Sequence, residues 1–336
     1  MQINIILLRK NSGLLRSNFL NLVLVNKMKY SVCILKKRGF MSEKIGFIGL
    51  GIMGSPMAKN LINAGLEVCA YDIIEKNLDH VVDSGAKKAC CPKEVSENSD
   101  IIIIMVQNSP QSEKAILGDE GALEGASKGD LIIDMSSISP LVSQKISKEC
   151  LKSGVSFLDA PVSGGEPGAI EGTLAIMTGG SSSDFERSKP VFDVLGGSSV
   201  LCGEVGAGNF TKLANQMIVG ANIHILAEAL TLTTKAGLDP ETVFNAIKGG
   251  LAGSNVMNTK APMMYERNFK PGFRIELHLK DITNAMETAN EMQIPLQVTS
   301  NLHQVLKSLV IDGNGVDDHS GILKFVEKQS GVEVKK

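Results

Sequence analysis

The stretch that most constrains this chain is KIGFIGLGIMGSPMAKNLI, residues 44–62, in which three glycines follow a short apolar run. Residues 44–50 are predicted to form a buried strand, and apolar residues at helical intervals after the glycines predict a helix. Gly49, Gly51 and Gly54 have the spacing G-x-G-x-x-G. The first glycine allows a tight turn, the second lets the backbone approach a pyrophosphate, and the third lets the helix lie close to the sheet. Because the start of the helix also offers free N–H groups to phosphates, this stretch predicts a dinucleotide site.

A second predicted strand strengthens that interpretation, because glycine-rich turns alone are common. Residues 67–71 end at Asp72, which follows Gly54 by 18 residues. An acidic side chain at this position can accept hydrogen bonds from the ribose hydroxyls of NAD. The alternative is a structural turn followed by a chance aspartate, and the whole context favours the dinucleotide site over it.

The chain is long for a single core at 336 residues, and its pattern changes about two thirds of the way along. Up to about residue 202, continuous apolar runs alternate with helical stretches, as expected for strands buried on both faces of a mostly parallel sheet. We therefore predict an α/β Rossmann-type, doubly wound NAD-binding domain over residues 41–204, with a late extension of the sheet. Its strands are predicted at 44–50, 67–71, 100–106, 130–135, 155–160, 173–178 and 198–202.

Residues 205–336 are predicted to form an all-α C-terminal domain for substrate binding and oligomerisation, joined to the first domain by one long helix. Apolar residues recur at helical intervals over 210–236, and the segment ends at Gly237, a plausible C-cap. A helix of that length would run about 40 Å, enough to cross a domain. Further helices are predicted to start at Asp239-Pro240 and to cover 281–292, 296–310 and 318–330.

Composition excludes several classes of function. Residues 1–40 hold eight Lys or Arg and no Asp or Glu, which leaves 26 basic against 36 acidic residues on the rest. A body that acidic is a poor candidate for nucleic-acid binding. The six cysteines lack C-x-x-C spacing and the five histidines are dispersed, so we expect no metal site, no disulfide framework and a reducing compartment. No apolar run reaches the length needed to span a membrane, so no membrane association is expected.

The basic segment 1–40 is expected to lie outside the fold. It fits either a mitochondrial transit peptide or an upstream extension of the reading frame, with Met41 as the working start. Because no strong Arg-rich amphipathic helix emerges, we favour the extension and a cytoplasmic location over the mitochondrial matrix. Mass spectrometry of the native N-terminus distinguishes the two, since cleavage would leave a terminus between about residues 20 and 40.

Two further stretches combine polar groups that suit a reaction. A predicted strand runs into Ser163-Gly164-Gly165, which offers a hydroxyl and two unhindered N–H groups able to hold a carboxylate. A plain turn is the alternative reading of these glycines. Near the start of the long helix, Lys212 has Asn215 at i+3 and Gln216 at i+4, on the same face. A lone lysine is usually a surface residue, but amide groups beside it suit a polar site better.

A third stretch, residues 269–281, contains Arg274, His278 and Lys280. We expect Lys280-Asp281 to open a helix. A charged helix start and a ligand-facing role are about equally favoured at this point.

Four motifs, in order, resemble the β-hydroxyacid dehydrogenase family: GFIGLGIMGSPMAKNL, DAPVSGGEPGAIEGTLAIMTGG, GAGNFTKLANQ and KPGFRIELHLKD. The likeness covers residues 44–334. It implies hydride transfer between a nicotinamide cofactor and a small hydroxy or oxo acid, in a homodimer or homotetramer. GGLAGS at 249–254 and the last motif look like the branch that reduces 2-hydroxy-3-oxopropanoate (tartronate semialdehyde) to glycerate. Alternatives are the branches acting on 3-hydroxyisobutyrate or on glyoxylate and succinic semialdehyde, or a silent dinucleotide-binding protein.

The resemblance also implies roles for single residues. NAD is favoured over NADP, because relatives that prefer NADP tend to place Asn-Arg where this chain has Asp72-Ile73. Lys212 matches the catalytic lysine, and a closed, cationic cleft should lower its pKa so that it can also act as a base. The expected substrate contacts are Ser163, Gly164, Gly165, Asn215 and Gln216, and the expected cofactor contacts are Gly49, Leu50, Gly51, Ile52, Met53, Gly54, Asp72, Val106, Gln107, Ser137 and Lys280.

Overall fold

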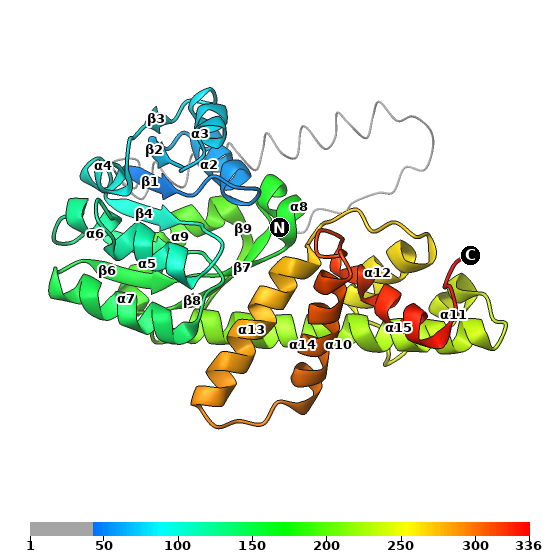
Figure 1. Ribbon diagram of the computed structural model, residues 1–336. Coiled ribbons are helices and arrows are strands. Elements are labelled where there is room, and N and C mark those ends of the chain that lie inside the picture. The colour runs from blue at the N-terminus through cyan, green and yellow to red at the C-terminus, as the bar shows by residue number, and fades with distance from the viewer. Residues whose placement is uncertain (1–42) are drawn as a thin grey trace, which may run out of the picture.

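The computed structural model describes residues 43–336, so the prediction made for residues 1–40 lies outside the described residues. The described part folds into an α/β domain followed by a helical domain (Figure 1). The helix α10 (Ala207–Lys235) starts beside the sheet and runs on through the helical domain. The predicted fold class is therefore confirmed.

Within residues 43–336 the sheet has nine strands in the order β3-β2-β1-β4-β5-β6-β8-β7, with β9 paired to β8. The strand β1 (Ile45–Ile48) lies between β2 (Val68–Tyr71) and β4 (Ile101–Ile104), and all three are parallel. The chain runs outward from β1 through β2 to β3, and then returns to form β4 on the other side of β1. A crevice forms at such a reversal outside the carboxyl ends of the strands, and this is where α/β sheets bind ligands. The other strands are β3 (Lys87–Lys88), β5 (Leu131–Asp134), β6 (Ser156–Asp159), β7 (Val162–Ser163), β8 (Leu174–Gly179) and β9 (Gly196–Gly203).

The strands are buried on both faces, which explains their unbroken apolar runs. In β4, Ile101 and Ile103 pack into one core, whereas Ile102 and Ile104 pack into another on the opposite face. Successive side chains of a strand point to opposite faces of the sheet, and helices cover both faces, so every strand residue can be buried. These helices are α2 (Gly54–Asn63), α3 (Glu75–Val82), α4 (Pro92–Glu97), α5 (Ser109–Leu117), α6 (Ala122–Gly125), α7 (Pro140–Lys152), α8 (Gly165–Glu171) and α9 (Ser182–Leu195).

The late extension of the sheet is present, and it is mixed in direction. The strand β8 runs antiparallel to β6 and β7 and parallel to β9. All seven predicted strands occur, within a few residues at their ends. The sequence does not predict β3 and β7, because a strand of two residues leaves no readable alternation.

The helical domain departs from the prediction at two helices. Its elements are α10, α11 (Pro240–Ile247), α12 (Asn255–Tyr265), α13 (Ile275–Glu291), α14 (Gln297–Ile311), the 3-10 turn η2 (His319–Gly321) and α15 (Ile322–Ser330). The helix α12 is missing from the prediction, since Pro262 inside it reads as a helix breaker. The expectation that Lys280-Asp281 opens a helix is wrong, because α13 already begins at Ile275. No side chain caps that start, so the sequence carries no cap signal there.

One helix among residues 43–336, α10, is long and apolar enough to cross a membrane by length and composition. The statement that no run is long enough is therefore wrong for this segment, because scattered polar residues hide its overall apolar character. In the structure α10 packs against α12, α13, α14 and α15. Ile223, Ala227 and Leu230 of α10 lie in the core of this domain. This is the packing of a central helix in a helical domain.

Candidate active site

The glycines of the first loop differ in what they accommodate. Gly49 has φ +94°, and a Cβ there would collide with the carbonyl oxygen of Met105. A Cβ at Gly54 would collide with the carbonyl oxygen of Gly49. At Gly51, in contrast, a Cβ would meet nothing within 4 Å. The first and third glycines are thus required by the protein's own packing, whereas the second leaves room for a ligand.

Asp72 lies at the carboxyl end of β2 beside this loop. Its carboxylate accepts the N–H of Leu50 at 2.6 Å and the N–H of Ile74 at 2.7 Å. The loop borders a cleft of about 1160 Å³ between α2 and α3, whose lining includes Leu50, Gly51, Ile52, Asn77, His80 and Glu166. The open face of Gly51 and a carboxylate held at the next strand end both fit a dinucleotide with its ribose near Asp72.

The loops after β4 and β5 meet at the same edge of the sheet. The N–H of Val106 donates to Ser136 Oγ at 2.9 Å, which joins the two loops. The next residue in each loop is an expected cofactor contact. Gln107 is exposed, whereas the carbonyl oxygen of Ser137 accepts a hydrogen bond from Lys280 Nζ at 2.7 Å. The bond from Lys280, on α13, links the helical domain directly to the cofactor edge of the sheet.

The start of α10 is fixed to the sheet by a buried carboxylate. Asp159, the last residue of β6, accepts the N–H of Gly206 through Oδ1 and that of Asn209 through Oδ2, each at 2.7 Å. Free N–H groups at a helix start favour such a partner. Burial nevertheless raises the pKa of Asp159 to about 6. A Cβ at Gly208 would lie 2.5 Å from the carbonyl oxygens of Asp159 and Met177, so α10 can approach the sheet this closely only with glycine there.

Asn209 connects α10 to the loop that carries Ser137. Its Oδ1 accepts the N–H of Ile138 at 3.0 Å, and its Nδ2 donates to Ser143 Oγ at 3.1 Å. All three residues are buried. The orientation of the first turn of α10 is thereby matched to the cofactor loop.

Lys212 lies one turn further along α10 and is buried, with 6% of its surface exposed. Burial lowers its pKa to about 8; the carboxylate of Asp281 opposes this shift and the ammonium of Lys280 adds to it. The expected lowering of the pKa is confirmed, with desolvation as its main cause and the neighbouring cation as a smaller one.

Asp281 is the centre of the polar groups around Lys212. Its Oδ2 accepts a hydrogen bond from Gln216 Nε2 at 2.6 Å, and its Oδ1 lies 2.8 Å from Lys280 Nζ. Asn215 Nδ2 in turn donates to Gln216 Oε1 at 2.9 Å. The structure thus brings Lys212, Asn215, Gln216 and Lys280 together around a carboxylate to which the sequence assigned no role.

The Ser163-Gly164-Gly165 turn spans the junction of two short elements. Ser163 ends β7, Gly164 (φ +140°) directly precedes α8, and Gly165 (φ +61°) is the first residue of α8. These angles belong to the region that favours glycine. A Cβ at Gly165 would lie 3.3 Å from the carbonyl oxygen of Gly272, in the loop before α13, so the helical domain reaches this turn. The hydrogen bonds of the described residues do not join the turn directly to Lys212.

The sequence missed the residues that hold the site in place. Asp159, Asn209, Asp281 and Gly272 are absent from the predicted contacts, although each lies within a motif quoted for the family resemblance. Their positions inside those motifs were the available signal. Of the expected cofactor residues in the first loop, Leu50 is buried, Ile52 is exposed and Met53 precedes α2.

Comparisons with known proteins agree with this geometry. Residues 44–206 match the family model for the NAD binding domain of 6-phosphogluconate dehydrogenase. Residues 206–326 match the model described as "NAD-binding of NADP-dependent 3-hydroxyisobutyrate dehydrogenase". The two matches meet at the start of α10.

Similar curated proteins and solved structures extend over nearly the same part of the chain. The 2-hydroxy-3-oxopropionate reductase of Escherichia coli is 42% identical, over 84% of this chain and 97% of the relative. The mitochondrial 3-hydroxyisobutyrate dehydrogenase of Mus musculus is 34% identical, over 85% of this chain and 87% of the relative. The structure of Mycobacterium tuberculosis 3-hydroxyisobutyrate dehydrogenase with L-serine has a TM-score of 0.79 at 29% identity, covering 84% of this chain and 98% of that one.

These matches span both domains, and the relatives carry names of dehydrogenases and reductases that act on CH–OH groups. The chain therefore belongs to the 3-hydroxyisobutyrate dehydrogenase-related family of β-hydroxyacid dehydrogenases and is an NAD(P)-dependent oxidoreductase acting on CH–OH groups.

Proposed function

We propose that this protein reduces 2-hydroxy-3-oxopropanoate to glycerate with NADH. The observation that carries the proposal is Lys212, a buried amine with a pKa of about 8 where the two domains meet. The Escherichia coli reductase, 42% identical over 97% of its length, supports the choice of substrate. The motifs GGLAGS and FKPGFRIELHLKD support the same branch of the family.

In the proposed reaction the aldehyde carbon gains a hydride and its oxygen gains a proton, which gives the terminal CH₂OH of glycerate. When bound, a nicotinamide coenzyme would supply the hydride. The ammonium of Lys212 stabilises the negative charge that develops on the oxygen and donates the proton. In the oxidation of glycerate the neutral amine accepts the proton from the terminal hydroxyl. A pKa of about 8 allows both roles near neutral pH, because both forms are then accessible.

The carboxylate of the substrate is assigned to the Ser163-Gly164-Gly165 turn. The turn offers the Ser163 hydroxyl and the N–H groups at the start of α8, which have no partner inside the helix. Fixing the carboxylate there, with Lys212 on the carbonyl oxygen, would present one face of the carbonyl for hydride transfer. The Mycobacterium tuberculosis dehydrogenase was solved with L-serine, a carboxylate that also carries a hydroxyl on its third carbon.

NADH is proposed over NADPH because of the residues at the end of β2. The carboxylate of Asp72 would accept the ribose hydroxyls of NADH and would repel a 2′-phosphate. The next residue, Ile73, is 82% exposed and offers no cationic group for a phosphate.

A second candidate is the oxidation of 3-hydroxyisobutyrate. The mouse enzyme and the Mycobacterium tuberculosis structure favour it, since both are 3-hydroxyisobutyrate dehydrogenases that match most of this chain. The two reactions differ in the acyl chain and not in the chemistry. Steady-state kinetics with 2-hydroxy-3-oxopropanoate, methylmalonate semialdehyde and glyoxylate, each with NADH and NADPH, will rank the candidates by kcat/KM. We expect the first substrate with NADH to lead; absence of NADH consumption with all three would contradict the proposal.

The role of Lys212 is tested by Lys212→Ala. We expect kcat to fall by at least about a hundredfold, because the proton donor and the cation that stabilises the negative charge on the oxygen are lost together. NADH binding, measured by fluorescence titration, should stay near normal. Lys235→Ala is the matched control, because Lys235 is an exposed lysine in the last turn of the same helix. A Lys212→Ala variant that keeps most of its activity would remove Lys212 from the mechanism.

A further inference from the structure

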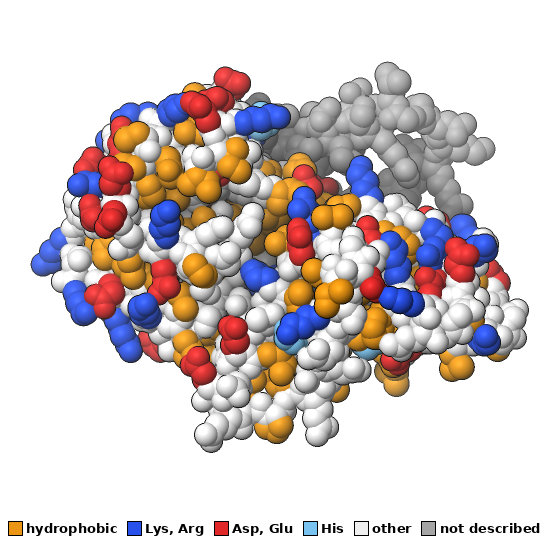
Figure 2. All heavy atoms as spheres, viewed as in Figure 1, with side chains coloured by type: hydrophobic (Ala, Val, Ile, Leu, Met, Phe, Trp, Pro, Cys, Tyr) orange, Lys and Arg blue, Asp and Glu red, His pale blue; other side chains and the backbone are white. Residues whose placement is uncertain are grey.

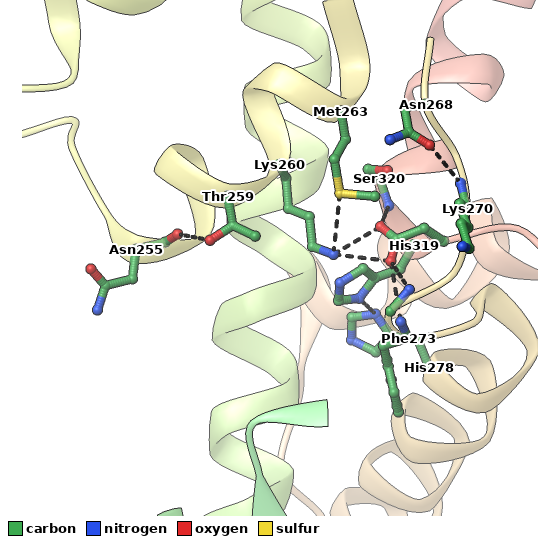
Figure 3. A network of polar contacts seen from close by, with 12 residues as sticks. Asn255, Thr259, Lys260, Met263, Asn268, Lys270, Phe273, His278, His319 and Ser320 are labelled. Carbon is green, nitrogen blue, oxygen red and sulfur yellow. Dashed lines mark hydrogen bonds and ion pairs between the residues drawn. The ribbon is translucent and has the colours of Figure 1, made fainter. Parts of the chain in front are cut away.

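A second buried polar cluster lies in the helical domain, outside the groups assigned above. At its centre is Asp318, whose side chain is fully buried. Its carboxylate oxygens lie 2.8 and 3.0 Å from Lys260 Nζ, which reaches across from α12 (Figure 3). The carboxylate also accepts the N–H of Gly272 at 3.0 Å, of Phe273 at 3.1 Å and of Ser320 at 2.9 Å. Both oxygens of this carboxylate therefore have polar partners. Two of the donors, the N–H groups of Gly272 and Phe273, belong to one turn.

That turn, residues 271–273, lies next to Gly165, one of the residues assigned to the substrate carboxylate. The carbonyl oxygen of Gly272 is the group that a Cβ on Gly165 would approach to 3.3 Å. Asp318 thus holds the N–H groups on one side of the turn, while the carbonyl on the other side faces the glycines assigned to the substrate carboxylate. Pro271 and Gly272 are exposed and belong to no helix or strand. Besides Asp318, the backbone of the turn is bonded at Phe273, whose carbonyl oxygen accepts the N–H of His319 at 2.9 Å.

The side chain of Phe273 is held by two buried histidines. Its ring lies edgewise against His278 at 5.8 Å and against His319 at 5.5 Å between ring centres, and Figure 3 shows the two imidazoles next to each other below Lys260. His278 Nε2 lies 3.1 Å from the carbonyl oxygen of Gln216, which can only accept, so His278 donates from Nε2. His278 Nδ1 is then the acceptor of the bond from His319 Nδ1, 3.0 Å away. The arrangement requires the ring of His278 to be neutral, and burial lowers the pKa of both histidines.

The histidine pair relates the turn to the helix that carries Lys212. Gln216, whose carbonyl oxygen accepts the hydrogen bond from His278, lies one turn after Lys212 on α10. Gly220 makes this contact possible, because a Cβ there would lie 3.0 Å from His278 Cε1. The backbone of the turn is thus bonded to Asp318, and the ring of Phe273 packs on two histidines, one of which is bonded to α10.

We propose that Asp318 and Lys260 are positioning residues for the reaction, which hold the turn 271–273 next to Gly165 and so fix one side of the site assigned to the substrate carboxylate. The inference rests on the proposed function and assigns these two residues a part in it. A buried ion pair contributes little net stability compared with apolar packing, so stability alone does not account for a charge at this place. The carboxylate of Asp318 instead accepts hydrogen bonds from two backbone N–H groups of the turn.

The test compares Lys260→Gln, Asp318→Asn and Lys260→Arg in the full-length protein, using whichever acid of the substrate panel the wild type reduces. In the first two variants we expect KM for the acid to rise about tenfold or more, with kcat changed less than about threefold, because the turn next to the carboxylate site is no longer held in place. NADH affinity should not change. Lys260→Arg should restore KM, since it keeps the ion pair. If Asp318→Asn does not fold, Lys260→Gln carries the test.

Glu327→Gln is the matched control. Glu327 is a mostly buried carboxylate in the same domain that pairs with Arg267 at 2.6 Å and accepts the N–H of Val334 at 2.7 Å, and neither partner belongs to the turn 271–273. It should lose stability without any change in KM. An unchanged KM in Lys260→Gln, or an equal rise in Glu327→Gln, would overturn the proposal.

Hydrogen exchange separates failure of this proposal from failure of the proposed function. In unliganded Lys260→Gln, the amides of Gly272 and Phe273 should exchange at least about tenfold faster than in the wild type. If the wild type reduces none of the three acids, the proposed function fails, and exchange still decides whether the ion pair holds the turn. Unchanged exchange at both amides would refute that role.

Discussion

Glycines with the same spacing can have different duties, and Gly51 and Gly54 show this at the scale of single residues. A methyl group at Gly54 would collide with the backbone of Gly49, whereas one at Gly51 would enter open space. Gly54 is therefore required for folding. Gly51 is required for ligand binding, because the pyrophosphate has to approach the backbone there.

These duties predict opposite phenotypes for two equal substitutions. Gly54→Ala should lower the free energy of unfolding by about 2 kcal/mol or more, because the methyl group overpacks the loop. Gly51→Ala should change it by less than about 0.5 kcal/mol. It should instead raise KM for NADH about tenfold, since a methyl group fills the approach to the pyrophosphate. Urea unfolding and initial rates measure the two effects, and equal loss of stability in both variants would refute the distinction.

The pKa of Lys212 predicts opposite pH profiles in the two directions. Reduction requires the ammonium, so its kcat/KM should be level below about pH 8 and fall above it. Oxidation requires the neutral amine, so its kcat/KM should rise up to about pH 8 and then level off. Because the cation of Lys280 lowers this pKa, Lys280→Met should move both breaks to higher pH. Stopped-flow or steady-state rates over pH 6–10 would show it, and profiles without a break would remove Lys212 as the titrating group.

Single residues were predictable where a local pattern carried them. The glycine loop and Asp72 follow from spacing, and Lys212 follows from the resemblance. The supporting contacts do not, because they join distant parts of the chain. Asp159 and Asn209 are 50 residues apart, and Ser137 and Lys280 are 143 apart. No spacing rule relates such pairs before the fold is known.

At the scale of elements, α10 connects the parts of the site. Its first turn is fixed by Asp159 and Asn209, its second turn carries Lys212, and its later turns form the core of the helical domain. A shift of its first turn would move the amine of Lys212 relative to the loop that bears Ser137. The hydrogen bonds of Asn209 oppose such a shift.

Asn209→Ala should therefore affect both stability and rate. The buried N–H of Ile138 would lose its acceptor, which should lower the free energy of unfolding by about 1–3 kcal/mol. The loop at 136–140 would also loosen, so kcat should fall about tenfold or more. Asn222→Ala serves for comparison, because Asn222 lies on the same helix and bonds only to its own helix, at Ile218. Similar losses of kcat in both variants would mean that Asn209 has no special part.

Element prediction succeeded for the seven longer strands, missed the two-residue strands β3 and β7, and failed where helix signals conflicted. The run IIII of β4 reads as a strand because both faces of the sheet are covered. The helix α12 contains Pro262, and α13 starts without a side-chain cap, so the usual boundary signals are misleading or absent. In both helices, packing in the domain core determines the structure.

At the scale of the whole molecule, charged side chains are dispersed over the surface, whereas some exposed apolar side chains are clustered. On the face in Figure 2, acidic and basic side chains are mixed over both domains. On α10, however, Ile218, Ile225 and Leu232 are 62%, 61% and 71% exposed. They recur every seven residues and form one stripe along the helix. We propose that this stripe is a contact between copies of the chain, in a homodimer or homotetramer.

Ile225→Lys should weaken that contact. A charge in the middle of an apolar interface is costly to bury, so the variant should have a lower mass than the wild type in light scattering after gel filtration. Leu151→Lys changes an apolar side chain on α7 that is 65% exposed and should leave the mass unchanged. A monomeric wild type, or equal masses for wild type and Ile225→Lys, would contradict the proposal.

The anchoring of α10 to Asp159 also limits how this architecture can be recombined. The matches to the two family models meet at residue 206, but the carboxylate on one side of that point satisfies N–H groups at and beyond it. A chimera joined at residue 206 would bring together an acceptor and a helix start that were not selected as a pair. Exchange of whole domains among relatives should therefore succeed only when the residues equivalent to Asp159, Gly208 and Asn209 come from the same parent.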